Sequence, residues 1–329
     1  MTNISIDTDA TIYQQKQIIN NEDVFDLSLI VEKLWAGKIV ILLTALAFSL
    51  AATFYAIKLP NVYRSSVLLA PTENASDNLG GMASQLGGLA SFAGLNLNGS
   101  NAIDKTTLSL EVLRSRLFIS SFVEKHSLKA DIMAPLLWDF DNGELIYNAE
   151  LYDEKNGVWV RKVDFPLKAE PSNQEIHEVF LKNMLEVSKN KDTGLITLSI
   201  SHISPIIAQL IVSELVVDIN STMKSRTIEE TQNNINYLQT QLDKTAVSQM
   251  QNVFYQLIEE QTKTMMLAEA NDSYVFSVVD PAVIPEIKSS PNRALICILG
   301  AILGIVLGIV LILLHGVFSY LKSLSKEGN

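Results

Sequence analysis

Two long apolar segments near the ends of the chain limit what it can fold into. They cover residues 39–57 and 294–318, and neither contains Asp, Glu, Lys or Arg. At about 1.5 Å per residue, each is long enough as a helix to cross a hydrocarbon core of about 30 Å. We therefore predict two transmembrane helices over these ranges. They would leave an N-terminal tail (1–38), a soluble domain (59–292) and a C-terminal tail (321–329).

The first apolar segment is predicted to be an uncleaved anchor. A signal peptide has an apolar stretch of about 7–15 residues close to the N-terminus, whereas this one begins at residue 39 and is longer. Lys and Arg flank both segments on both sides and give no orientation bias. Because a long domain can cross the membrane regardless of its charge, we expect both short tails in the cytoplasm and residues 59–292 in the periplasm.

Composition narrows the function further. The formal net charge is −11, whereas nucleic-acid binding requires a basic surface, so no nucleic-acid partner is expected. The single cysteine, Cys297, lies in the second apolar segment, which excludes an intramolecular disulfide. The four histidines are scattered without metal-ligand spacing, and no G-x-S-x-G or G-x-x-x-x-G-K-[ST] motif is present. We expect no catalytic residue, no metal site and no cofactor.

The soluble domain mixes strand and helix patterns. Strands are predicted over 62–71 (VYRSSVLLAP), 194–201 and 274–279, and helices over 105–126 and 173–188, the latter capped by Ser172 or Asn173. Asn156-Gly157 predicts a hairpin, and Asp139 and Asp141 border a turn at Asn142-Gly143. The uncharged, glycine-rich stretch 78–100 is predicted to be a flexible or subunit-packing loop. The fold class is therefore α+β.

One long stretch is predominantly helical. Residues 206–280 contain no glycine and no proline, and apolar residues recur at helical spacing with a register slip between Leu242 and Met250. A straight helix over 205–270 would be about 100 Å long. The strand at 274–279 lies too close to the second apolar segment for the chain to return from that height. We predict a helical hairpin that turns near 243–248, and the strand at 274–279 beside the strand at 62–71. The alternative is a single long helix that lies obliquely, or that starts high on the domain and descends.

Two features mark the entry to the second span. Pro281, Pro285 and Pro291 stiffen the short connection before it. Gly300, Gly304 and Gly308 form G-x-x-x-G-x-x-x-G on one helix face, a spacing that lets membrane helices approach closely. We predict that these six residues couple the chain to a polymerase or to neighbouring copies. Alternatively, glycine is simply common in membrane helices.

Taken together, these segments resemble the Wzz chain-length determinant family, the class 1 polysaccharide co-polymerases of Gram-negative inner membranes. The segments that carry the resemblance are the first span, VYRSSVLLAP, EVLRSRLFISSFVEKHSL, VFLKNMLEVSKNKDTGLITLSIS and VVDPAVIPEIKSSPNRALI. Family members often have Pro-Lys before the final proline, where this chain has Lys288-Ser289-Ser290-Pro291.

The resemblance implies a membrane-proximal α/β base, a long helical extension and closed, bell-shaped homo-oligomers. It implies no catalysis, but control of the modal length of O-antigen or another lipid-linked polysaccharide made by a Wzy-type polymerase. Related kinases carry a Walker-type module after the second span, which is not expected here.

Two other classes of protein share parts of this layout. A two-span periplasmic sensor would need a cytoplasmic output domain, and the predicted tail at 321–329 is short for one. A periplasmic adaptor of an export system has long helical hairpins but normally no second span near its C-terminus. Lipopolysaccharide from a deletion strain would separate these alternatives from the chain-length regulator.

Overall fold

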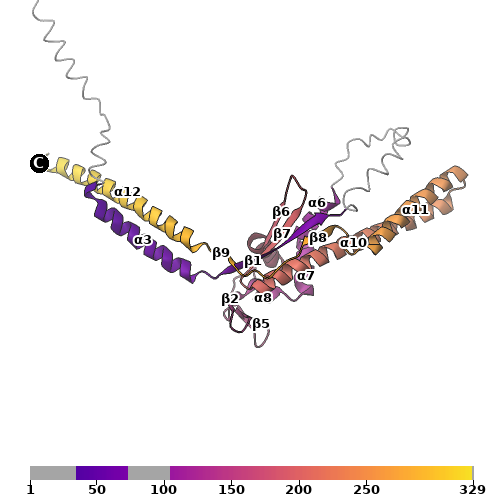
Figure 1. Cartoon of the computed structure of the whole chain (residues 1–329), viewed down its shortest axis with the longest axis horizontal. Coiled ribbons are helices and arrows are strands. Elements are labelled where there is room, and N and C mark those ends of the chain that lie inside the picture. The colour runs from indigo at the N-terminus through magenta and orange to yellow at the C-terminus, as the bar shows by residue number, and fades with distance from the viewer. Residues whose placement is uncertain (1–34, 73–103, 328–329) are drawn as a thin grey trace, which may run out of the picture. The chain divides into compact units, whose positions relative to one another are not determined.

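The computed structural model describes residues 35–72 and 104–327, and it divides into two compact units (Figure 1). One unit comprises residues 1–59 and 292–329, and the other residues 60–291. Nearly all of the predicted tail over 1–38 lies outside the described residues, and so does the whole of the predicted loop over 78–100.

The first unit is a pair of helices, α3 (Lys38–Lys58) and α12 (Arg293–Glu327), which lie side by side along their length (Figure 1). Their outward apolar side chains are exposed, for example Leu42 at 68% and Leu303 at 53%. The helix α12 continues to Glu327, beyond the predicted boundary at 318. No glycine or proline interrupts residues 317–327, so the change from apolar to polar side chains alone does not end the helix.

The second unit is built around an antiparallel sheet whose central strand is β1 (Val62–Pro71). The strand β7 (Ile196–His202) pairs with one edge of β1, and β6 (Leu185–Lys189) pairs with β7. The other edge of β1 pairs with β8 (Phe276–Asp280) and, near its start, with β9 (Lys288–Ser290). Leu69 lies opposite Val278, which confirms the predicted neighbourhood of these two strands.

Short helices cover the core beside this sheet: α6 (Lys105–Arg114), α7 (Arg116–Lys125), α8 (Lys129–Met133) and α9 (Asn173–Val179). The prediction of one helical segment over 105–126 is wrong at Ser115. Its backbone is extended, and its hydroxyl accepts a hydrogen bond from Phe118 N–H. A serine that caps a new helix therefore divides the segment, although the apolar spacing continues through it.

The predicted helix over 173–188 is also too long. Ser172 caps α9, and with Glu175 it forms a reciprocal capping box. A π-helical turn (Phe180–Met184) follows, and the chain is already extended at Leu185. Residues 185–189 pair with β7, so a tertiary ladder overrides their helical spacing.

The long helical region is a hairpin of α10 (Pro205–Lys244) and α11 (Ser248–Ala270), as predicted (Figure 1). Three residues, 245–247, reverse the chain, and Thr245 and Val247 are extended. The first half of α10 packs on the sheet through fully buried residues that include Ile211, Leu215 and Ile219. The second half extends away with α11 as its partner.

Two small hairpins complete the unit. The strands β2 (Pro135–Asp139) and β3 (Glu144–Tyr147) form the first, and β4 (Tyr152–Asp153) and β5 (Val158–Trp159) form the second, at the predicted Asn156-Gly157 turn. The Asp139 carboxylate accepts hydrogen bonds from the backbone N–H groups of Asp141 and Asn142, so it caps a turn as expected.

Candidate functional site

The glycine face of α12 packs against α3 of the same chain. A side-chain carbon added at Gly304 would lie 2.7 Å from the Cα of Ala45 and 2.8 Å from the carbonyl oxygen of Thr44. At Gly308 it would lie 2.5 Å from the hydroxyl oxygen of Thr44 and 2.9 Å from the Cα of Ile41. Three of these four atoms belong to the backbone of α3, and real side-chain carbons do not approach other atoms so closely, so glycine is needed at both positions.

The facing surface of α3 includes three small residues that were not predicted to matter, Thr44, Ala45 and Ala52, together with Ile41 and Phe48. Gly300 faces Ala52, and the Thr53 hydroxyl lies 3.3 Å from the Cys297 sulfur. The regular spacing of small residues within the first apolar segment was the available signal. The predicted coupling of Gly300, Gly304 and Gly308 to a polymerase or a neighbouring copy stays a prediction, since α3 covers this face here.

The three prolines lie in the connection that leads from the sheet toward α12. Pro281 and Pro285 fall between β8 and β9, and Pro291 follows β9. The hydroxyl of Ser65 donates a hydrogen bond of 2.8 Å to the carbonyl of Val283, which holds this connection against β1. The prolines lie in one compact unit and the glycines in the other, and their coupling to a common partner stays a prediction.

Asn220 joins α10 to the start of β8. Its side-chain oxygen accepts hydrogen bonds from the N–H groups of Val275 (2.8 Å) and Phe276 (2.9 Å), and its amide donates to the carbonyl of Phe276 (2.9 Å). This buried amide satisfies backbone groups much as a neighbouring strand would. Its role could not be predicted from the neighbouring sequence, because its partners lie 55 and 56 residues further along the chain.

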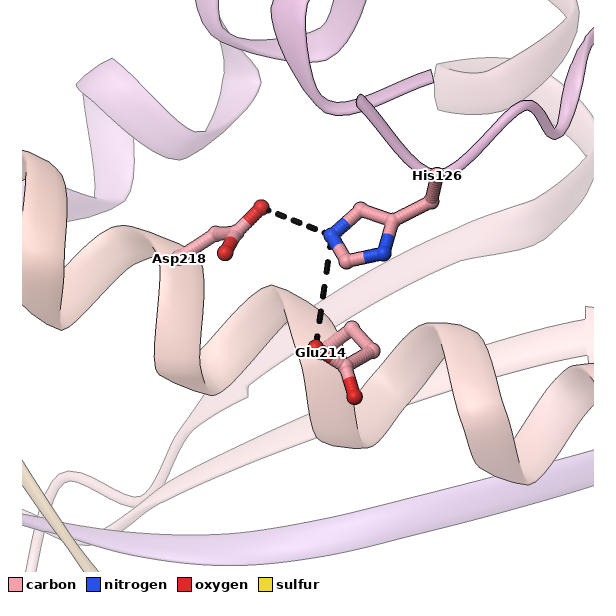
Figure 2. A group of neighbouring side chains, drawn as sticks. All are labelled: His126, Glu214 and Asp218. Carbon is pink, nitrogen blue, oxygen red and sulfur yellow. Dashed lines mark hydrogen bonds and ion pairs between the residues drawn. The ribbon is translucent and has the colours of Figure 1, made fainter. Parts of the chain in front are cut away.

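His126, Glu214 and Asp218 form a polar cluster between the end of α7 and α10 (Figure 2). Their potential ligand atoms lie within 4.8 Å of one another. Glu214 and Asp218 are four residues apart and therefore share one face of α10, while His126 comes from a distant part of the sequence. This cluster could not be predicted from the spacing of histidines along the chain, because tertiary packing brings His126 next to the two carboxylates of α10.

Contacts within the cluster indicate an ion-pair network. Lys125 Nζ lies 2.5 Å from one carboxylate oxygen of Asp218, and His126 Nε2 lies 2.9 Å from the other. The Asp218 side chain is 7% exposed, so the lysine ammonium neutralises a nearly buried negative charge. A metal ion would have to displace this ammonium, and the arrangement fits a tie between α7 and α10 better than a metal centre.

A groove of about 570 Å³ runs beside α10, between that helix and the segment that leads into β8. Its polar lining includes Lys224 and Asp272, whose charged groups lie 3.4 Å apart, and Asn220, whose amide is bonded to β8. Because Lys224 and Asp272 bind each other and Asn220 binds β8, these polar groups stabilise the packing of α10 and are not free to bind a substrate.

Residues 23–126 match the family model described as Wzz, the chain length determinant protein. Over this range the chain is similar to the Wzz family. Residues 235–316 match a second model, described as a G-rich domain on putative tyrosine kinase, and this range includes all three glycines of α12. A comparison with curated proteins found no match.

Two solved structures are also similar to this chain. A full-length bacterial polysaccharide co-polymerase is 14% identical, with a TM-score of 0.36, and the match covers 91% of this chain and 99% of that chain. A fragment of WzzB, a polysaccharide co-polymerase from Salmonella Typhimurium, is 12% identical, with a TM-score of 0.28, and the match covers 70% and 100%. The similarity to the Wzz model, together with the apolar helices, indicates an inner-membrane protein.

Proposed function

We propose that this chain is a non-catalytic, oligomeric regulator of polysaccharide chain length that acts with a Wzy-type polymerase on a lipid-linked glycan. The observation that carries the proposal is the match of residues 23–126 to the chain length determinant family. O-antigen is the glycan that the sequence resemblance favours. Closed homo-oligomers are the form in which the protein would act.

We further propose two spans, α3 and α12, with both tails in the cytoplasm and residues 59–292 in the periplasm. By length and composition, three described helices could cross a membrane: Lys38–Lys58, Pro205–Lys244 and Arg293–Gly316. Half of the apolar window of Pro205–Lys244 is buried within the protein, against 6% and 11% for the other two. The apolar stripe of α10 is already used by the core, whereas those of α3 and α12 are free to contact lipid.

A regulator without chemistry of its own is supported by how the polar clusters are used. Lys125 and His126 both bind Asp218, and Lys224 binds Asp272. Nucleophilic or acid–base catalysis needs a group that is poised toward a substrate, whereas these groups hold helices together.

Deleting the gene and separating the host's glycans on a gel tests this function. Polymer should still be made, but its length distribution should lose its mode, and the full chain supplied on a plasmid should restore the mode. Complete loss of polymer in a clean deletion would contradict the proposal, because it would mean that the chain is needed to form the glycosidic bond. An unchanged length distribution would contradict it as well.

A further inference from the structure

The first half of α10 is apolar on the side that faces solvent as well as on the side that faces the core. Ile211 and Leu215 are fully buried, whereas Ile206, Leu210 and Val217 are 44%, 41% and 59% exposed. At 3.6 residues per turn, positions 206, 210 and 217 share one face of the helix. A helix buried on one side normally has a polar opposite side, and a helix that is apolar all round is normally covered all round. The exposed side of α10 therefore has the composition of a surface that a partner covers.

The strand β8 and the connection that follows it continue this surface. Val217 and Val278 line the same groove beside α10. The side-chain amide of Gln209 lies 3.5 Å from the carbonyl oxygen of Ala282, which holds the connection next to the helix. Residues 283 and 284 follow directly, and both are more than half exposed. These elements belong to one compact unit, so their mutual arrangement is fixed. Together the exposed aliphatic residues form the α10 surface: Ile206, Leu210, Val217, Val278, Val283 and Ile284.

The charged groups near the α10 surface flank it. On one side of α10, the Glu214 carboxylate lies 4.0 Å from Nε2 of His126, at the end of α7. Two turns beyond Val217, Lys224 pairs with Asp272. The connection after β8 carries three exposed charged residues: Asp280, Glu286 and Lys288. An aliphatic centre with charged groups around it is the usual anatomy of a protein–protein interface.

The composition of the α10 surface also indicates which partner covers it. None of its six residues is aromatic or basic, whereas a surface that binds lipid head groups carries both kinds of side chain. Interfaces between identical subunits are more apolar than those between proteins that also exist apart. Two copies with a net charge of −11 each repel one another, so their association has to come from apolar burial and should strengthen with added salt.

We propose that the α10 surface is where one copy of this chain contacts a second copy. The contact would bury the exposed side of α10 together with the start of the connection after β8. It leaves the distal half of the α10–α11 hairpin free for other contacts. The proposal rests on the homo-oligomeric form proposed above, and it adds the surface through which the copies meet.

Val217→Glu in the full chain, purified in detergent, tests this contact by sedimentation. Glutamate favours a helix more than valine does, and Val217 is exposed, so the fold should persist. In the contact, the new carboxylate would be buried without a partner. The assembly should therefore dissociate at a protein concentration higher by about tenfold or more than that of the unchanged chain. Val158→Glu is the matched control, because Val158 is 52% exposed on β5 and lies outside the α10 surface, and it should leave dissociation unchanged.

A labelling experiment checks the same surface without a charge. In a Cys297→Ser background, Val217→Cys should react with a maleimide about tenfold more slowly in the assembly than in the dissociated chain, whereas Val158→Cys should react equally in both. Equal rates at 217, or an assembly that Val217→Glu weakens no more than Val158→Glu does, would refute this surface while the oligomer stands. Slow reaction at 217 in the dissociated chain would refute it too, because the chain itself would then cover the surface. If the unchanged protein stays a single chain at every concentration, the oligomeric form is refuted as well.

Discussion

His202 is buried at the end of β7 and holds two distant segments together. Its Nδ1 accepts a hydrogen bond of 3.0 Å from Ser204 N–H, and its Nε2 faces the carbonyl of Asp131 at 2.9 Å. Because an N–H can only donate and a carbonyl can only accept, the ring is neutral and carries its proton on Nε2. Burial lowers the pKa of His202 below its usual value of 6.5.

This residue makes stability depend on pH. The unfolded chain binds a proton at His202 more readily than the folded chain does. The contribution of His202 to the free energy of unfolding is therefore complete above pH 6.5 and decreases as the pH drops below that value. We expect the unfolding temperature to be lower at pH 5 than at pH 7.5. NMR titration of the protein labelled at its histidines should give one pKa clearly below 6.5, and a His202→Gln variant should lack that resonance. Four unshifted titrations would contradict this prediction.

Arg161 supports a second prediction for a single residue. Its bonds to Glu175 lower the pKa of that carboxyl from 4.5 to about 2, so the folded chain keeps the ion pair down to about pH 2. The stability that the pair contributes is complete above pH 4.5 and is lost as the pH falls from 4.5 toward 2. Arg161→Ala leaves a largely buried carboxylate without its partner and should reduce the free energy of unfolding by about 3 kcal/mol. Chemical denaturation at pH 7 measures this loss. Lys162→Ala, at an exposed neighbouring cation, should change stability by less than about 0.5 kcal/mol.

Single residues with local partners could be predicted from the sequence, and those with distant partners could not. Ser172 and Asp139 bond to backbone groups two or three positions away, so the residue type and its neighbours were sufficient. Asn220 and Asp218 look like ordinary polar residues of a helix until β8 and α7 are in place. Their partners are brought to them by tertiary packing, which spacing along the chain does not contain.

At the scale of whole elements, the α10–α11 hairpin should depend on helix continuity and tolerate change at its turn. Ile235 is buried within α10, and Ile235→Pro should cost about 3 kcal/mol or more, because it removes a helical hydrogen bond and clashes with the preceding turn. Val247→Pro is the matched control, since Val247 is extended and exposed outside both helices. Circular dichroism and denaturation of the purified proteins compare the two. Equal stability of both variants would contradict the hairpin.

The close packing of α3 and α12 gives an element-level test of the glycine face. Thr53→Cys places a thiol opposite the native Cys297, because the Thr53 hydroxyl oxygen lies 3.3 Å from the Cys297 sulfur. Mild oxidation should therefore join the two helices by a disulfide. Adding Gly304→Leu should block this link, since even one added carbon would lie 2.7 Å from the backbone of Ala45. Both proteins should insert normally because the segment stays apolar.

The same glycine variant tests the proposed coupling. Gly304→Leu should be present at normal membrane levels while the host's glycan shows altered or unregulated length. Val306→Leu changes an exposed residue of α12 and should leave the length unchanged. Wild-type length with Gly304→Leu would refute a role for this face in chain-length control, whatever happens to the packing of the two helices.

Element types were predictable where one pattern dominated. The strand at 62–71, the long hairpin and the Asn156-Gly157 turn are present because apolar period and turn chemistry agree there. The failures came at Ser115 and at Leu185, where a cap or a strand partner competes with helical spacing. The sequence alone did not predict which face of α12 packs against which face of α3. That pairing depends on residues of both helices that contact each other only in the folded structure.

For the whole molecule, the decisive prediction is topology. In a Cys297→Ser background, a cysteine at Val247 should react with an impermeant maleimide once the outer membrane is made permeable. A cysteine at Ser323 should react only after the inner membrane is broken. The physical reason is that a charged reagent cannot cross the apolar layer formed by lipid around α3 and α12. Reaction at 323 but not at 247 in unbroken cells would invert the proposed orientation.

The order of strands has a consequence for how the molecule is made. The central strand β1 leaves the ribosome early, yet its partners β7, β8 and β9 begin at residues 196, 276 and 288. Such distant pairing makes folding slow, because long stretches of chain must be closed into loops before the ladder forms. Until residue 290 has been synthesised, β1 keeps an open edge that could pair with another nascent chain. We therefore expect chains that end before residue 290 to be insoluble rather than to form a smaller working domain.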